Sequence, residues 1–386
     1  MRKLCLPVLL LVLFIPAGCG GRWVYSDYRE IDQMELIQAL GADEENGLIT
    51  VTASTGGRQE PVVLRSTSVS ISRAMRQMQD YTSRKYIFFG HTAHLLLGEG
   101  AAERGVEKYL EHMAHSAEMR LNTFLYVVRG GTAGEAIASA GKAEDGVVDL
   151  LTSLEKDVQL MSESHVFTCG ETAEMLLEQG SCLAAAVSLV RREDILAGED
   201  PVTLEVAGYA ILQEGRLAGY LDPDLAKGAN LLMDQGGEDI LEVPDGNGGW
   251  AALRLIRSRV VYLPEFREGE LTALRIRVEL DCSLDEIPPQ THAGDRETLE
   301  SLISGAEELE LERICRVLER SRSLGADFCG IGRQVRTKCP WAFDGMAVSW
   351  TERFPELPLE VEADCRILRA RNAEGAFSIG EREGKA

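Results

Sequence analysis

The chain has 386 residues and a formal net charge of −22, with 62 acidic and 40 basic side chains. An anionic surface repels the phosphate backbone, which argues against nucleic acid as a partner. After residue 18 no run of 18 uninterrupted apolar residues occurs, so we expect the remainder to be water-soluble. Its length is sufficient for two or three domains with apolar cores.

The first residues have the parts of an export signal. Arg2 and Lys3 precede an apolar run over residues 4–15, and Ala17 and Gly18 precede Cys19. This run is too short for a bilayer core of about 30 Å, so residues 1–18 are predicted to be a cleaved signal peptide. The pattern is similar to the lipobox of bacterial lipoproteins, in which the cysteine is lipidated. The alternative is a plain signal peptide with Cys19 incidental.

Lipidation would make Cys19 the first mature residue, followed by a short tether over residues 19–27. Loss of Arg2 and Lys3 changes the formal charge from −22 to −24. Anionic lipid head groups repel such a body, so membrane attachment would depend on the acyl chains of a diacylglyceryl cysteine, palmitate for example.

Residues 28–198 are predicted to form an N-terminal α+β domain. Ser68 is expected to cap its first helix. Residues 142–200 are expected to be helix and loop, with a domain boundary near 197–201. The hydrophobic pattern predicts a mixed sheet packed by helices, with strands over 47–53, 86–97 (broken at Gly90) and 123–128, and helices over 69–80, 101–115 and 132–140.

The second half is expected to contain a middle domain over 202–248 and a C-terminal domain over 249–375, before a frayed tail over 376–386. In the middle domain, two strands join at Glu214-Gly215, and Pro223 begins a helix. In the C-terminal domain, strands over 250–263 and 270–284 are predicted to pair antiparallel, beneath a helix over 296–324. A late strand is expected over 357–371. The fold class is therefore multi-domain α+β with mixed or antiparallel sheets.

The cysteine pattern favours neither a disulfide framework nor a zinc site. Seven cysteines remain after Cys5 and Cys19, an odd number, and none forms a C-x-x-C pair. Most are expected to be small core residues, Cys315 on its helical apolar stripe for example.

Two histidine pairs have the spacing that invites a metal site. His112 and His115 lie one turn apart on a predicted helix, whereas His91 and His94 lie in a turn and strand. A structural role is the simpler interpretation of both pairs, and no metal or cofactor is expected. No nucleophile motif or phosphate loop is present, so we do not expect an enzyme.

Five stretches occur in the order found in one family. They are REIDQMELIQALGAD, RKYIFFGHTAHLLLGEGAAERGVEKYLEHM, MRLNTFLYVVRG, GYAILQEGRLAGYLD and PWAFDGMAVSWTERFPELPLEVEADCRI. Together with the lipobox, this order resembles the Ger(x)C lipoproteins, the C subunits of spore germinant receptors.

The resemblance implies a three-domain α+β protein tethered by lipid to the outer face of the spore inner membrane. It implies integral-membrane partners, an A-type and a B-type subunit, and no enzymatic activity. Trp341 and Trp350 are either core residues or, where exposed, contacts with these partners. The main alternative is the solute-binding lipoprotein of a transporter, for which we would expect two similar lobes with parallel sheets.

Overall fold

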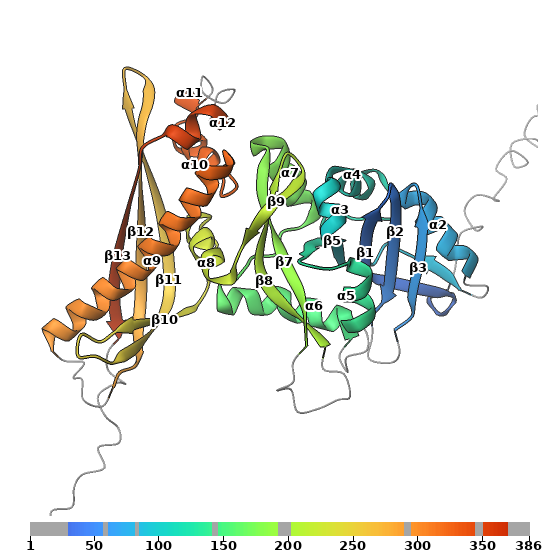
Figure 1. The fold of residues 1–386 in the computed structure, drawn as a ribbon, viewed down its shortest axis with the longest axis horizontal. Helices are drawn as coiled ribbons and strands as arrows, with labels where there is room; N and C mark the ends of the chain where they lie inside the picture. The colour runs from blue at the N-terminus through green and yellow to red at the C-terminus, as the bar shows by residue number, and fades with distance from the viewer. Residues whose placement is uncertain are drawn as a thin grey trace, which may run out of the picture.

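The computed structural model describes residues 30–56, 61–81, 85–140, 146–191, 202–288, 295–343 and 350–369. The predicted signal peptide (1–18), Cys19 with the tether (19–27) and the tail (376–386) lie outside these ranges. The described chain is α+β and contains a nine-stranded and a four-stranded sheet. The two sheets lie one after the other along the long axis of the molecule (Figure 1).

The first sheet is mixed, as predicted. Its order is β3-β2-β1-β5-β6-β7-β8-β9, with β4 also paired to β1. The central strands β1, β5, β6 and β7 are parallel, and the flanking strands are antiparallel. The strands are β1 (Met34–Glu45), β2 (Leu48–Thr55), β3 (Val63–Ser68), β4 (Tyr86–Phe88), β5 (His94–Gly98), β6 (Phe124–Val128), β7 (Ser181–Arg191), β8 (Val202–Gln213) and β9 (Arg216–Leu221).

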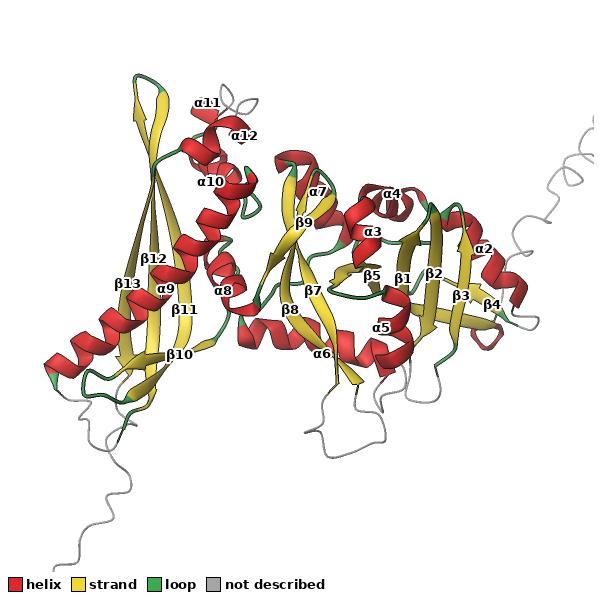
Figure 2. Cartoon of the chain, in the orientation of Figure 1, coloured by secondary structure: helices red, strands yellow, loops and turns green. Residues whose placement is uncertain are grey.

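Helices cover both faces of this sheet (Figure 2). Alternate residues of β5 enter different cores: Leu95 and Leu97 pack in one, and Leu96 packs in the other. A strand that is buried on both faces is apolar throughout, so it has no polar alternation. One face holds α2 (Ile71–Tyr81), α3 (Glu99–Arg104), α4 (Glu107–His115) and α7 (Cys169–Gln179), and the other holds α5 (Ala133–Ala140) and α6 (Gly146–Met161).

Three local predictions need correction. The helix predicted over 101–115 is divided at Gly105, whose φ of 124° is accessible mainly to glycine. Ser68 is the last residue of β3, and the hydroxyl of Ser70 accepts the hydrogen bond from the Arg73 N–H instead. Residues 181–191 form β7 rather than helix or loop, because neighbours on both sheet faces bury its alanine-rich run.

The sheet continues past the boundary predicted near residues 197–201. Strand β7 precedes this stretch and β8 follows it, and the two pair antiparallel. Residues 202–248, predicted as a middle domain, are shared between the two sheets. Strands β8 and β9 extend the first sheet, β10 (Asp239–Pro244) begins the second, and α8 (Pro223–Leu232) lies between them. These residues therefore form no sheet of their own.

The second sheet has the order β10-β11-β12-β13. Strands β11 (Trp250–Arg267) and β12 (Glu270–Glu286) form the predicted antiparallel pair, and α9 (Arg296–Leu324) covers one face of the sheet (Figure 1). Strand β13 (Leu359–Arg369) pairs parallel to β12, so the sheet is not wholly antiparallel. Between these strands the chain passes through α9, α10 (Ile331–Lys338), α11 (Pro340–Phe343) and α12 (Trp350–Arg353), a crossover of the kind that parallel neighbours need.

The face of the second sheet opposite α9 carries arginine–carboxylate pairs across its strands. Arg275 Nε lies 2.9 Å from Glu360 Oε2, and Arg277 Nη2 lies 3.2 Å from Glu362 Oε2. Arg257 also pairs with Asp281. Exposed pairs of this kind contribute little stability, but they keep an uncovered sheet face polar.

Candidate functional site: the junction of the two sheets

The two sheets share one apolar core. Tyr209 and Ile211 of β8 belong to the same buried cluster as Leu253 of β11 and Ile314 of α9. Helix α8 supplies Ala229 and Leu232 to this cluster. The halves of the molecule are therefore joined by a continuous core and not by two separate solvated surfaces.

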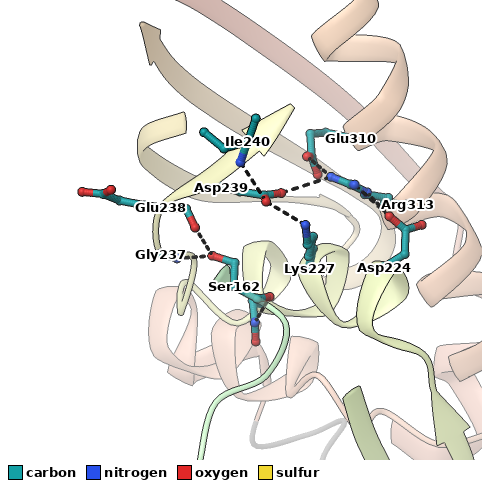
Figure 3. Close-up of polar contacts among 10 residues, drawn as sticks. Ser162, Asp224, Lys227, Gly237, Glu238, Asp239, Ile240, Glu310 and Arg313 are labelled. Carbon is teal, nitrogen blue, oxygen red and sulfur yellow. Dashed lines mark hydrogen bonds and ion pairs between the residues drawn. The ribbon is translucent and has the colours of Figure 1, made fainter. Parts of the chain in front are cut away.

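A buried ionic network lies within this junction (Figure 3). Arg313 of α9 is 8% exposed and contacts acids on three elements. Its Nη1 lies 2.6 Å from Glu310 Oε1 on the same helix, and its Nε lies 2.8 Å from Asp224 Oδ1 on α8. A longer contact of 3.5 Å joins Arg313 Nη1 to Asp239 Oδ2 on β10. One guanidinium thus connects both sides of the junction.

Lys227 of α8 is the second cation of the network. Its Nζ lies 2.7 Å from Asp239 Oδ1, which also accepts the Ile240 N–H at 2.9 Å. Asp239 is 7% exposed. A buried carboxylate of this kind requires such partners, because desolvation of an unpaired charge is costly.

Glu310 is the member of the ionic network that has an unsatisfied hydrogen-bond acceptor. It is 1% exposed, and its Oε2 has no hydrogen-bond partner among the described residues. Burial raises the pKa of the Glu310 carboxyl, although Arg313 opposes this shift. The network contains three carboxyl groups and two cations, and Asp224 is the one carboxyl group of the three that is exposed.

Polar groups extend the junction toward the first sheet. Ser162, which follows α6, accepts the Gly237 N–H at 2.8 Å and donates its hydroxyl to Glu238 O at 3.3 Å. Asn230 Nδ2 of α8 donates to Ser162 O at 2.7 Å. These bonds fix the segment that leads into β10. The Ser162 hydroxyl is committed to a carbonyl, and no base contacts it among the described residues, so the geometry is structural and not that of a nucleophile.

The structure separates the two tryptophans that the sequence left as either core residues or partner contacts. Trp341 on α11 is 71% exposed, and its ring centroid lies 5.5 Å from that of Phe266 on the β11–β12 hairpin. Trp350 on α12 is 7% exposed, and its Nε1–H donates to Asp327 Oδ2 at 2.9 Å. Trp350 is therefore a core residue and is not available at the surface.

Asp327 explains why Trp350 is buried. Its carboxylate accepts the N–H groups of Ile331 at 2.8 Å and Gly332 at 2.7 Å, which are the first two residues of α10. The buried acid thus satisfies free donors at the start of this helix. The indole N–H of Trp350 completes the set, and α12 is held against α10.

The histidines do not assemble into a metal site in the described part of the chain, where no group of three or more metal-ligating side chains is found. His112 Nε2 lies 3.2 Å from Met75 Sδ, and burial lowers its pKa. His115 Nδ1 contacts Glu111 O at 2.8 Å. His91 is exposed in a turn, whereas His94 is buried in β5 beside Tyr126.

Five of the seven described cysteines are buried, and all seven are free thiols. Cys315 is exposed, contrary to the prediction of a core position. It follows the buried Ile314 by one residue, and a step of 100° around the helix takes its side chain off the apolar stripe. Cys282 and Cys365, on neighbouring strands, have sulfurs 3.8 Å apart.

The ionic network was not anticipated from the sequence. Glu310 and Arg313 lie one turn apart in a helix rich in glutamate and arginine, where most such residues are exposed. Asp224, Lys227 and Asp239 are distant in sequence. No local pattern distinguishes these five residues from ordinary surface charge.

The architecture defines a class: an α+β protein in which a mixed, helix-covered sheet and a smaller, one-sided sheet share a core. Residues 27–189 match the family model described as spore germination protein N-terminal domain. Residues 207–370 match the model described as spore germination B3/GerAC like, C-terminal. The chain therefore belongs to the Ger(x)C family of spore germination proteins.

A solved structure supports the fold. The crystal structure of the GerBC protein matches with a TM-score of 0.57 and 16% identity, covering 85% of this chain and 96% of that one. No curated protein matches the chain. Among the described helices, none is both long and apolar enough to span a membrane.

Proposed function

We propose that this chain is the lipid-anchored C subunit of a nutrient germinant receptor. It acts in spore germination by assembly and signalling with an A-type and a B-type integral-membrane subunit, at the outer face of the spore inner membrane. The observation that carries this proposal is that the two germination-family models match the chain in order, over both halves.

The anchor is assigned to Cys19. The lipobox-like sequence precedes it, and the acidic body has no other evident affinity for anionic lipids. Two acyl chains on a diacylglyceryl cysteine are sufficient for stable attachment, whereas one chain holds only marginally.

Catalysis is not part of the proposed function. The matched family models are named for spore germination and not for an activity. The solute-binding alternative gains no support from the topology. The described sheets are dissimilar, one mixed with nine strands and one largely antiparallel with four, and not two similar parallel lobes.

Membrane fractionation tests the anchor. We expect Cys19→Ala, produced in cells without the A-type and B-type subunits, to leave the membrane fraction. Cys5→Ala changes a cysteine of the same leader outside the lipobox and should remain membrane-bound. Retention of Cys19→Ala in the membrane fraction would contradict the anchor.

Co-purification from spore membranes tests the assembly. The wild-type chain should recover both integral-membrane subunits, and Trp341→Ala should recover less of them, because aromatic side chains often dominate interfaces. Recovery of neither subunit with the wild-type chain would contradict the proposed assembly.

A further inference from the structure

A cavity of 340 Å³ lies between α7 and α10, where the first sheet meets the second half of the chain. An adjoining cavity of 270 Å³ shares Gln179 and Arg333 with it. A volume of this size is at the lower end of the range for small-molecule sites, which are frequent where domains meet.

The wall of the cavity contains a buried acceptor without a donor. Gln179 Oε1 at the end of α7 is inaccessible and has no hydrogen-bond partner among the described residues. Gly330 lies directly against it: a Cβ there would be 2.8 Å from this oxygen, and its φ is 72°. A buried acceptor that lacks a donor costs stability, so rotation of the Gln179 amide toward the cavity, where a ligand N–H or O–H group can reach its oxygen, is favoured.

Arg333 supplies a positive charge at the same cavity. No carboxylate in the described ranges lies within ion-pair distance of its guanidinium, whereas Arg336, one turn later, pairs with Glu178 of α7 at 2.9 Å. Unpaired guanidinium groups bind carboxylates well, because their N–H groups match the two oxygens.

The remaining wall is mixed, with Gln235, Gln334 and Thr337 beside apolar side chains. Phe167 and Phe328 are buried and line the cavity together with Met175 and Met233. Methionine side chains adapt to the shape of an apolar ligand. The cavity thus offers a cation, a hydrogen-bond acceptor and an apolar surface.

We propose that this cavity binds a small carboxylate that also carries an N–H donor and an apolar group. The carboxylate pairs with Arg333, the donor binds Gln179 Oε1, and the apolar group packs on Met175 and Met233. Such a ligand contacts α7 and α10 together, so its binding stabilises their association. This site is independent of the lipid anchor and goes beyond the proposed function.

The probe is hippurate, which combines a carboxylate, an amide N–H and a phenyl ring. The full-length chain, labelled at its methionine methyl groups, is titrated in detergent and followed by NMR. We expect the methyl signals of Met175 and Met233 to shift, and those of Met75 and Met78 on α2 to stay in place. Absence of any shift at Met175 and Met233 would overturn the proposal.

Matched probes and variants assign the contacts. Benzoylpropionate, in which a methylene replaces the N–H, should bind to the wild type about threefold more weakly than hippurate does. Gln179→Leu should bind the two probes equally. Arg333→Gln should weaken hippurate binding about fivefold or more. Lys338→Gln removes the same charge from α10 outside the cavity and should have no effect. An equal loss in Arg333→Gln and Lys338→Gln would overturn the assignment, since it would indicate non-specific attraction.

Discussion

Arg313 on α9 donates to Asp224 in the first turn of α8, with 2.8 Å between Nε and Oδ1. This bond joins the covering helix of the second sheet to the helix that follows the first sheet. The same guanidinium contacts Glu310 and Asp239. One side chain therefore joins α8, β10 and α9 at the junction.

Replacing Arg313 should be costly. Arg313→Met keeps much of the apolar volume but leaves Glu310 without its cation in the interior, and we expect a loss of about 3–5 kcal/mol in the free energy of unfolding. Urea denaturation measures this. Arg316→Met is the control on the same helix, since Arg316 is 53% exposed and 4.0 Å from Glu312. It should change stability by less than about 1 kcal/mol, and similar losses in both variants would contradict the buried network.

Glu310 should make stability depend on pH. Burial and Asp239 raise its pKa above 4.5, against Arg313 and Lys227. A raised folded pKa means that this group's contribution is fully present below 4.5 and is lost as the pH rises through the folded pKa. Glu310→Gln should therefore gain stability relative to the wild type as the pH rises toward 7. Glu308→Gln, exposed on the same helix, should stay within about 0.5 kcal/mol. A relative gain that shrinks with rising pH would contradict the raised pKa.

His94 should make stability depend on pH in the opposite direction. Burial lowers its pKa from 6.5 to about 4, so the unfolded chain takes up a proton that the folded chain does not. The contribution of neutral His94 to stability is fully present above pH 6.5. It is lost as the pH falls toward 4, by up to about 3 kcal/mol. Denaturation at a series of pH values should show this slope in the wild type and in His91→Gln, whose histidine is exposed. A slope that persists unchanged in His94→Gln would assign it to other groups.

The two tryptophans should differ in stability measurements. Trp350→Phe removes the N–H that Asp327 accepts and should cost about 1–3 kcal/mol. Trp341→Phe changes an exposed ring and should stay within about 0.5 kcal/mol. Thermal unfolding of the two variants compares them directly, and equal losses would show that Trp341 is also part of the core.

Helices and strands were predicted correctly where the hydrophobic pattern was long or where glycine marked the end of an element. The helix over 296–324 has the predicted bounds, and Gly325 ends it in the left-handed conformation. The β11–β12 pair and the turn between β8 and β9 were also predicted. Strand β7 was missed because an alanine-rich run gives no alternation when both faces of the strand are buried.

The sequence by itself indicated the acidic character, the lipobox-like leader, the element types and the family resemblance, because these depend on local order along the chain. Only the tertiary structure decided which charges are buried and which tryptophan is exposed. It also showed that β8 joins the first sheet across the stretch where a boundary was predicted. The physical reason is that burial depends on neighbours far away in sequence: Arg313, Glu310 and Asp239 look like surface residues until α8, β10 and α9 pack together around them.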